Sequence, residues 1–485
     1  MSRRKTRALR LEKHAQYFVL FVLASIPLLF GAAHPFVQGI YTALLLVGCG
    51  GWLLLNFPAL GLAQPGLVWL VPPLLIILYA VLLSLPLPLS LVAVLSPHRA
   101  GTIARVNELA GTDYHWISLG FSQQVALKEG IYYLSILVYF LCLEILLPRD
   151  RRFYDRLLRV MIVVGVIEAL YGLLQVVSPS LGVLWLKNAY KSACGTIIYK
   201  NQFAAFLNLC WPVALAVGLG FYSRRLAEMA RRMRKYKHHK RKFLKKKLAA
   251  KNDQAPLYWF ATALIMLAVL FSLSRAGVLS MLFIWLLIFA LLSFSRKSKI
   301  FLFASILLLI LVFGSILGFD TIVRRFALLD VTGMARIRLW LASLAIARDF
   351  PWTGTGLESY RVLSPVYLEH FPDTVLYDRA HNEYIELVIE LGLPVATGLF
   401  LWIMALMIRS VRRLWKIRRL PFHMIRRSTL VGITSLAAIT GFLLHGAVDF
   451  AWRLPANLLY CTTLAAFVSY ALRVPEPAPG TGTDR

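Results

Sequence analysis

Apolar runs of about twenty residues, separated by shorter polar segments, make up most of this 485-residue chain. A helix needs about 20 apolar residues to cross a bilayer. Twelve runs are long enough, at approximately residues 16–33, 38–57, 68–87, 128–147, 158–177, 201–221, 256–273, 276–294, 300–318, 384–407, 429–447 and 455–472. The pattern predicts an all-α membrane protein with about twelve transmembrane helices.

The composition agrees with this prediction, because 59% of the residues are hydrophobic and the mean hydropathy is +0.68. A basic N-terminus before the first apolar run imitates a signal peptide, but with so many spans behind it we expect an uncleaved first helix. Of the five cysteines only Cys194 falls in a predicted loop, so we expect neither a disulfide framework nor a metal site. We find no phosphate-binding glycine loop, no dinucleotide glycine pattern and no zinc-ligand spacing.

The formal charge of +30 is concentrated in the loops on one side of the predicted helices. These loops hold 36 of the 53 Lys and Arg residues, at 1–13, 149–159, 224–251, 296–299 and 409–427. Because cytoplasmic loops of membrane proteins are rich in Lys and Arg, both termini and the basic segment 224–251 are predicted to be cytoplasmic. This distribution favours a topology signal, with contact to anionic lipid headgroups, over nucleic-acid binding.

The spans divide the chain into four parts. Residues 1–318 hold the first nine predicted helices, and residues 384–472 hold the last three. Between them lies the largest outer loop, 319–383, with seven basic and eight acidic residues. The tail 473–485 returns to the cytoplasmic side, and its Pro and Gly content predicts disorder.

The outer loop contains an apolar repeat of helical period between residues 335 and 350. Ile337, Trp340 and Leu344 belong to this repeat, which predicts an amphipathic helix on or near the membrane surface. Pro351 and the following TGTG run are expected to end this helix.

A polar cluster, His381, Asn382 and Glu383, stands at the mouth of the tenth predicted helix. Glu386 and Glu390 follow inside the helix, and the i, i+3, i+7 spacing from Glu383 puts three carboxylates on one face. Carboxylates are costly in hydrocarbon, so they face the interior of a bundle or a wet cavity. Two readings stay open: the carboxylates pair with other helices, or they belong to a site centred on His381.

Cationic and amide side chains fall at the same predicted outer face. Lys200 and Asn201 begin the sixth span, Arg275 lies in the turn between spans seven and eight, and Arg379 precedes the tenth. One cation alone is explained by snorkelling to lipid headgroups. Together with His381 they favour a cationic site suited to a diphosphate group. At a helix N-terminus the dipole disfavours imidazolium, so a neutral His381 would accept a proton from a hydroxyl.

Several segments resemble the O-antigen ligase and polymerase superfamily. They are HNEYIELVIELGLP at 381–394, RIRLW at 336–340, GTGLESY at 354–360, HGAVDF at 445–450, GTIIYKNQFAAF at 195–206 and SLSRAG at 272–277. The resemblance implies a polytopic inner-membrane glycosyltransferase of the C-type architecture. Such enzymes use a polyprenyl-diphosphate-linked glycan at the periplasmic face and need no metal or other cofactor.

The resemblance also implies roles for individual side chains. His381, with Glu383, is expected to activate the acceptor hydroxyl. Glu386, His445 and Asp449 are expected to support His381 from behind, although a hydrogen bond between helices explains His445 and Asp449 equally well. The expected diphosphate-binding residues are Lys200, Asn201, Arg275, Arg336, Arg338, Arg379 and Asn382.

The identity of the acceptor stays open at this stage. A ligase uses the lipid A-core, a polymerase uses a second lipid-linked glycan, and a related enzyme glycosylates protein. A transporter that couples ions through the intramembrane carboxylates predicts broken helices and an inverted repeat, which the sequence does not display. A lipid channel of the flippase kind would need no acceptor base.

Overall fold

The computed structural model describes residues 3–56, 70–186, 192–235, 254–292, 329–369, 371, 377–416 and 420–473, together with residues 300, 304, 308, 311, 312 and 315. Within these ranges the fold is mainly helical, with one short antiparallel ribbon, β1 (Pro86–Pro88) with β2 (Trp116–Ser118), and an isolated bridge between Val183 and Leu186. The predicted all-α class is confirmed.

Seven of the described helical segments are long and apolar enough to cross a membrane. They are α2 to α3 (Pro35–Asn56, comprising α2 at Pro35–Leu45, the π-turn Leu46–Gly50 and α3 at Gly51–Asn56), α7 (Gln123–Arg149), α8 (Arg151–Val177), α9 (Lys200–Lys235), α17 (Glu383–Trp415), α18 (Arg427–Gly446) and α19 (Pro455–Arg473). Shorter apolar helices are α4 (Val71–Ser84), α11 (Ala255–Phe271) and α12 (Arg275–Leu291). The N-terminal helix α1 spans Arg3–Leu28.

Eleven of the twelve predicted spans correspond to described helices. The ninth, 300–318, lies almost entirely outside the described residues, as do most of 224–251 and the tail 474–485. The total of about twelve membrane crossings therefore stays a prediction.

Helix α9 is the centre of the bundle, since the most apolar part of Lys200–Met229 is wholly buried. It packs against α8, α11, α12, α18 and α19. Asn208 binds the backbone of α12 by donating to the Gly277 carbonyl at 2.9 Å, and Trp211 stacks on Trp285 at 5.1 Å between ring centroids. Polar contacts of this kind hold helices together where lipid removes the hydrophobic driving force.

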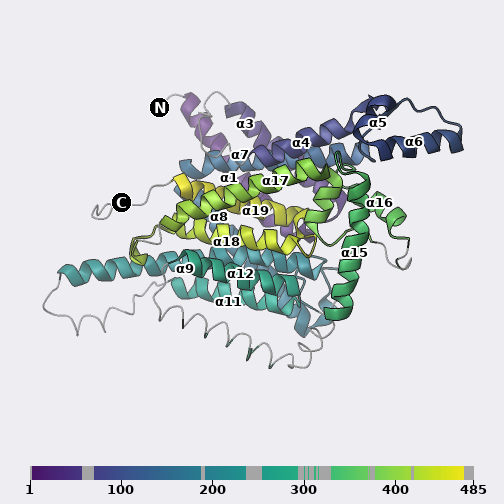
Figure 1. Ribbon diagram of the computed structural model, residues 1–485. Helices are drawn as coiled ribbons and strands as arrows, with labels where there is room; N and C mark the ends of the chain where they lie inside the picture. The colour runs from purple at the N-terminus through teal and green to yellow at the C-terminus, as the bar shows by residue number, and fades with distance from the viewer. Residues whose placement is uncertain are drawn as a thin grey trace.

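Figure 1 shows the long helices side by side, with α15 (Leu329–Asp349) crossing one end of them. The short helix α16 (Tyr360–Tyr367) lies beside α15, and α5 (Leu89–Leu95) and α6 (Pro97–Ala110) extend at the same end. The start of α1 and the far ends of α9 and α19 lie at the opposite end (Figure 1). The described parts of the predicted cytoplasmic segments thus lie at one end of the bundle, and the described parts of the predicted periplasmic segments lie at the other.

The predicted amphipathic helix exists as α15, and it ends at Asp349, before Pro351. Its protein-facing side differs from the predicted apolar face. Leu339 and Ile346 are buried, whereas Leu341 and Leu344 of the apolar repeat are 65% and 43% exposed. Most of the apolar repeat, Ile337, Leu341 and Leu344, therefore faces away from the protein, as a membrane-surface helix requires, whereas Trp340 turns toward Ala380.

A break in α17 joins the outer loop to the bundle. Gly392 has φ +74°, and a Cβ there would lie 2.4 Å from the Trp352 carbonyl oxygen. Gly354 has φ +66°, and a Cβ there would lie 2.4 Å from the Gly392 nitrogen. Two glycines are needed because two backbones pass each other without room for side chains. The contact places Glu358, which follows this turn, over the upper part of α17.

Candidate active site

His381 stands immediately before α17 in the left-handed backbone region, with φ +52°. Asn382 is the N-cap of the helix, and its Oδ1 accepts from the backbone N–H groups of Tyr384 at 3.0 Å and Ile385 at 3.2 Å. A left-handed non-glycine residue costs on the order of 1–3 kcal/mol and persists only where its surroundings impose it. The conformation of His381 is therefore held from outside.

The peptide before His381 is gripped on both sides. The indole Nε1 of Trp340, on α15, donates to the Ala380 carbonyl at 3.0 Å. The Ala380 N–H donates to Glu386 Oε1, on α17, at 2.7 Å. Glu386 was predicted to support His381, and the structure places it one peptide away from that residue. Two helices thus fix the backbone on which the imidazole is mounted.

Asp449 is the side chain that faces the imidazole. Its Oδ1 lies 3.5 Å from Nδ1 of His381 and accepts from the Phe450 N–H at 2.9 Å. The His381 side chain is 37% exposed although its Nδ1 is buried, so the exposed part of the ring lies away from Asp449. Burial opposes ionisation of Asp449, but contact with His381, the nearby His445 and the backbone bond hold its pKa below the usual range. Asp449 is thus a carboxylate that favours a proton on Nδ1 and leaves Nε2 as the acceptor.

Two predicted diphosphate-binding residues meet at Asp449. Asn201, in the first turn of α9, donates through Nδ2 to Asp449 Oδ2. Arg336, on α15, donates to the Val448 carbonyl at 2.9 Å and lies 3.9 Å from Asp449 Oδ2. Asn201, Arg336 and His381 come from three distant parts of the sequence, and Asp449 joins them.

Phe450 completes the wall behind the imidazole. Its ring lies edge-on to His381 at 4.9 Å and edge-on to Tyr199 at 5.6 Å, measured between ring centroids. Edge-to-face contacts at these distances are favourable and restrict ring rotation. The sequence analysis did not single out Phe450, although it belongs to the HGAVDF segment that contains Asp449.

Side chains of α8 bind the loop that precedes Lys200 and Asn201. The amide of Gln175 donates to the Gly182 and Gly195 carbonyls and accepts from the backbone N–H groups of Cys194 and Gly195. Glu168 lies about two turns before Gln175 on α8, and its Oε2 accepts from the Thr196 N–H at 2.8 Å. These buried contacts set the position from which α9 begins.

The contact between Thr196 and Glu168 indicates a protonated carboxyl group. The Thr196 hydroxyl lies 2.7 Å from the Pro27 carbonyl and 2.6 Å from Glu168 Oε1, yet it has one hydrogen to donate. A carbonyl only accepts, so both contacts are satisfied when the hydroxyl donates to Pro27 and Glu168 donates to the hydroxyl. Glu168 then acts as a neutral donor and acceptor.

Glu168→Gln is therefore expected to leave the thermal unfolding midpoint of the purified protein nearly unchanged, because an amide reproduces both hydrogen bonds. Glu168→Ala leaves the buried Thr196 N–H without its partner and is expected to cost about 1–3 kcal/mol. Gln175→Glu is the matched reverse change and is expected to destabilise, since a carboxylate cannot donate to two carbonyls. A glutamine variant as unstable as the alanine variant would show that Glu168 is charged.

Arg453 is the centre of a buried ion-pair network that the sequence analysis missed. It lies between α18 and α19, and its side chain is 9% exposed. Its guanidinium binds four carboxylates, those of Glu358 at 2.6 Å, Glu383 at 3.2 Å, Glu386 at 3.1 Å and Glu390 at 3.1 Å. The predicted shared face of Glu383, Glu386 and Glu390 therefore exists, and it faces an arginine.

Arg379 is the second cation of this network. It grips Glu358 with two nitrogens, at 3.1 and 2.7 Å, and lies 3.4 Å from Glu386. Burial opposes ionisation of Glu358, but the charges of Arg453 and Arg379 hold its pKa at about 2. The planar fork of Arg379, which was predicted to bind diphosphate, holds the chain that leads into His381.

Two further predicted site residues make contacts within the protein. Glu383, which was predicted to act with His381, is buried, accepts from the Trp452 N–H at 2.8 Å and pairs with Arg453. Asn382, which was predicted to bind diphosphate, caps α17 through its Oδ1. Both residues position the start of α17, and their acceptor atoms are turned to the protein.

The remaining predicted site residues lie near the same end of the bundle. Lys200 is the first residue of α9, next to Asn201, and Arg275 is the first residue of α12. Arg338 is exposed on α15, two residues after Arg336. His445 is buried at the end of α18, and neither of its ring nitrogens has a hydrogen-bond partner among the described residues.

Residues 260–403 match the family model described as O-antigen ligase. This part of the chain is therefore similar to the O-antigen ligase family. The matched region runs from α11 into α17 and includes Arg275, Arg336 and His381, whereas Asn201 and Asp449 lie outside it. No curated protein matches the chain.

The family match and the apolar helices together indicate a multi-pass membrane protein. Among the described residues no three His, Cys, Asp or Glu side chains gather in a way that would hold a metal ion. The expectation of a reaction without a metal cofactor therefore keeps its sequence basis and stays a prediction.

Proposed function

We propose that the protein transfers a glycan from a polyprenyl diphosphate carrier to an acceptor hydroxyl at the periplasmic membrane face, as an O-antigen ligase acting on the lipid A-core. The observation that carries this proposal is the pairing of His381 with Asp449. A titratable ring with a carboxylate behind Nδ1 and an exposed opposite edge is the arrangement of an oriented general base. Its place at one end of a membrane-embedded bundle fits a donor whose carrier stays in the lipid.

In the proposed reaction His381 Nε2 takes the proton of the acceptor hydroxyl as the oxygen attacks the anomeric carbon. A new carbon–oxygen bond forms there, and the bond from the anomeric carbon to the diphosphate oxygen breaks. The electron pair leaves with the diphosphate, and direct attack inverts the configuration of the anomeric carbon. Asp449 stabilises the imidazolium that results.

Cations near His381 are proposed to stabilise the charge that develops on the leaving diphosphate. Arg336 is held beside Asp449 at the inner side of the site, and Arg338 is exposed on the same helix. Lys200 and Arg275 each begin a helix, where backbone N–H groups add to the attraction for an anion. Arg379 is assigned to the buried network and has no part in diphosphate binding in this proposal.

The proposal is tested by reconstituting the purified protein in vesicles with an undecaprenyl-diphosphate-linked glycan and one acceptor at a time. We expect transfer to the lipid A-core. Growth of the lipid-linked glycan without a core acceptor would instead identify a polymerase, and transfer to a protein acceptor a protein glycosyltransferase. Absence of transfer to all three would contradict the proposed activity.

A pair of arginines on α15 provides a matched test of the cationic role. Arg338→Ala is expected to raise the KM for the lipid-linked donor by about fivefold, the effect of one cation near a phosphate at the membrane surface. Arg348, on the same helix and 84% exposed, makes only a 3.8 Å contact with its neighbour Asp349. Arg348→Ala is expected to leave KM unchanged, and equal effects of the two changes would show that only overall charge matters.

A further inference from the structure

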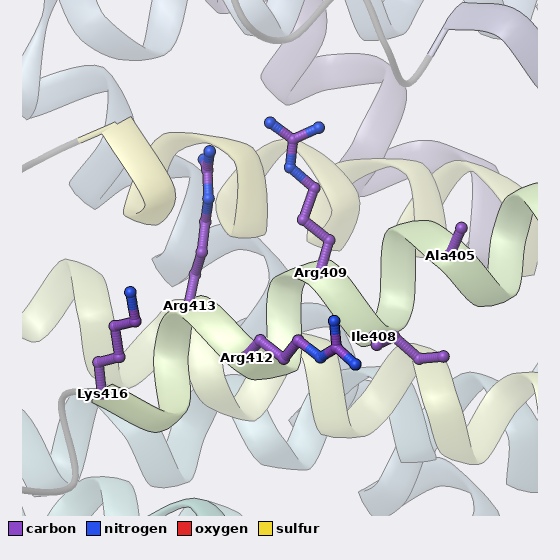
Figure 2. Close-up of a pocket in the computed structure, with 6 residues that line it drawn as sticks. All are labelled: Ala405, Ile408, Arg409, Arg412, Arg413 and Lys416. Carbon is purple, nitrogen blue, oxygen red and sulfur yellow. The ribbon is translucent and has the colours of Figure 1, made fainter.

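A hollow of about 430 Å³ lies along the second half of α17, at the end of the bundle opposite to His381. Its lining is one face of the helix, made of Ala405, Ile408, Arg409, Arg412, Arg413 and Lys416. Figure 2 shows the side chains of Arg409, Arg413 and Lys416 rising from the same side of the ribbon, while Arg412 extends along the helix toward Ile408. Four cationic and two apolar side chains thus line this hollow.

These four cations have no carboxylate within 4.0 Å among the described residues. Four acidic residues in the described segments at this end pair with other arginines: Glu12 with Arg149, Asp150 with Arg156, Asp155 with Arg427 and Glu144 with Arg473. Like charges three and four residues apart on one helix repel each other. The dipole at a helix C-terminus offsets part of this repulsion, and an anion in the hollow would remove the rest.

The surroundings of the hollow indicate an anion that carries acyl chains. Leu401 and Met404, one to two turns before Arg409, are 66% and 58% exposed, and Trp415 beyond it is 45% exposed. An apolar surface followed by basic residues and a tryptophan is typical of a membrane helix at its lipid–water interface. Acyl chains would lie along the apolar surface and the phosphate among the cations.

The hollow is separate from the diphosphate site proposed above. Arg409 follows the break at Gly392 by 17 residues, a rise of about 25 Å, and the helix before the break begins at Glu383. The hydrocarbon core of a bilayer is about 30 Å thick. The hollow and the site around His381 therefore lie near opposite ends of the bundle.

We propose that the hollow along the second half of α17 binds the headgroup of an anionic phospholipid in the leaflet opposite to His381. The phosphate sits between Arg409 and Arg413, which are one turn apart, and Arg412 and Lys416 close it from the sides. The bound lipid fixes the far end of the helix whose first turn carries the backbone of the active site.

The test is native mass spectrometry of the detergent-purified full chain, titrated with dioleoylphosphatidylglycerol, with dioleoylphosphatidylcholine and with inorganic phosphate. We expect one phosphatidylglycerol to bind at least tenfold more tightly than phosphatidylcholine. Arg409→Gln with Arg413→Gln is expected to weaken phosphatidylglycerol binding by about 30-fold, from two cations near a lipid phosphate. Inorganic phosphate at millimolar concentration is expected not to displace the lipid.

The matched control is Arg151→Gln with Arg152→Gln, which removes two exposed charges from the start of α8 at the same end of the bundle. This control is expected to change phosphatidylglycerol binding less than twofold. Equal losses in the two double variants would overturn the proposal, because attraction to the whole basic surface would then explain binding. Equal affinity for the two lipids, or displacement by inorganic phosphate, would overturn it as well.

Discussion

Replacing His381 with glutamine is expected to reduce glycan transfer by about 10²- to 10⁴-fold, the usual contribution of a positioned general base. Glutamine keeps a hydrogen-bonding group near Asp449 but has no basic nitrogen. The imidazole is 37% exposed and packs mainly on Phe450, so the fold is expected to be retained. The measurement is the initial rate of transfer in reconstituted vesicles, alongside binding of the lipid-linked donor, which should be nearly unchanged.

Asp449→Asn is expected to reduce glycan transfer almost as much as His381→Gln. Oδ2 of Asp449 accepts from Asn201 and Oδ1 from the Phe450 N–H, so an asparagine at 449 leaves one of these donors without its acceptor. Where the NH₂ takes the place of Oδ1, the amide donates to Nδ1, and the ring proton moves to Nε2, the nitrogen that must accept. The variant tests orientation separately from basicity.

A second histidine–aspartate pair offers the control. His98 lies 3.8 Å from Asp349 at the same end of the bundle, and its side chain is 49% exposed. His98→Gln is expected to leave transfer unchanged. Near-normal transfer by the His381→Gln variant would mean that His381 only orients the acceptor and that another group removes the proton.

Arg453→Ala is expected to lower stability by about 3–5 kcal/mol, the usual effect of removing one partner from a buried ion pair. Four buried carboxylates would lose their main counter-charge at once, and Arg379 reaches only Glu358 and Glu386 among them. The measurement is the thermal unfolding midpoint of the protein in detergent. Arg453→Lys keeps the charge but not the planar guanidinium, so its unfolding midpoint is expected to lie between those of the unchanged protein and the alanine variant.

The control for this change is Arg427→Ala. Arg427 is also largely buried, but it pairs with one carboxylate, that of Asp155, which is 32% exposed. Its loss is expected to cost about 1 kcal/mol or less, as for a solvent-accessible pair. If the Arg453 and Arg427 variants unfold at the same temperature, the four-carboxylate network does not hold the fold together.

The helices of this protein were predictable because each needs one property, an apolar run of sufficient length. The segment between residues 86 and 118 was not, since its short ribbon and the helices α5 and α6 depend on contacts formed only after the bundle assembles. Gly120 donates to the Leu83 carbonyl and Phe121 to the Thr355 carbonyl, from a segment more than 200 residues away. No local pattern encodes such partners.

The candidate site, like the fold, was predictable only in part. His381, Asn201, Arg336 and Asp449 were identified by residue type and by motif, and the structure brings them together. Arg453 was missed because a single arginine between two apolar runs is explained by snorkelling to lipid headgroups. The three aligned glutamates of α17 were the available clue, because three buried carboxylates on one face require a counter-charge from another helix.

The position of Arg453 in the chain also sets the order in which the protein matures. Polypeptides fold from the N-terminus as they leave the ribosome, and Arg453 follows Glu383 by 70 residues. The glutamates of α17 therefore enter the membrane before their guanidinium partner has been synthesised. The C-terminal hairpin of α18 and α19 carries both Arg453 and Asp449, so a chain that ends before this hairpin lacks the partner of the α17 glutamates and the partner of His381.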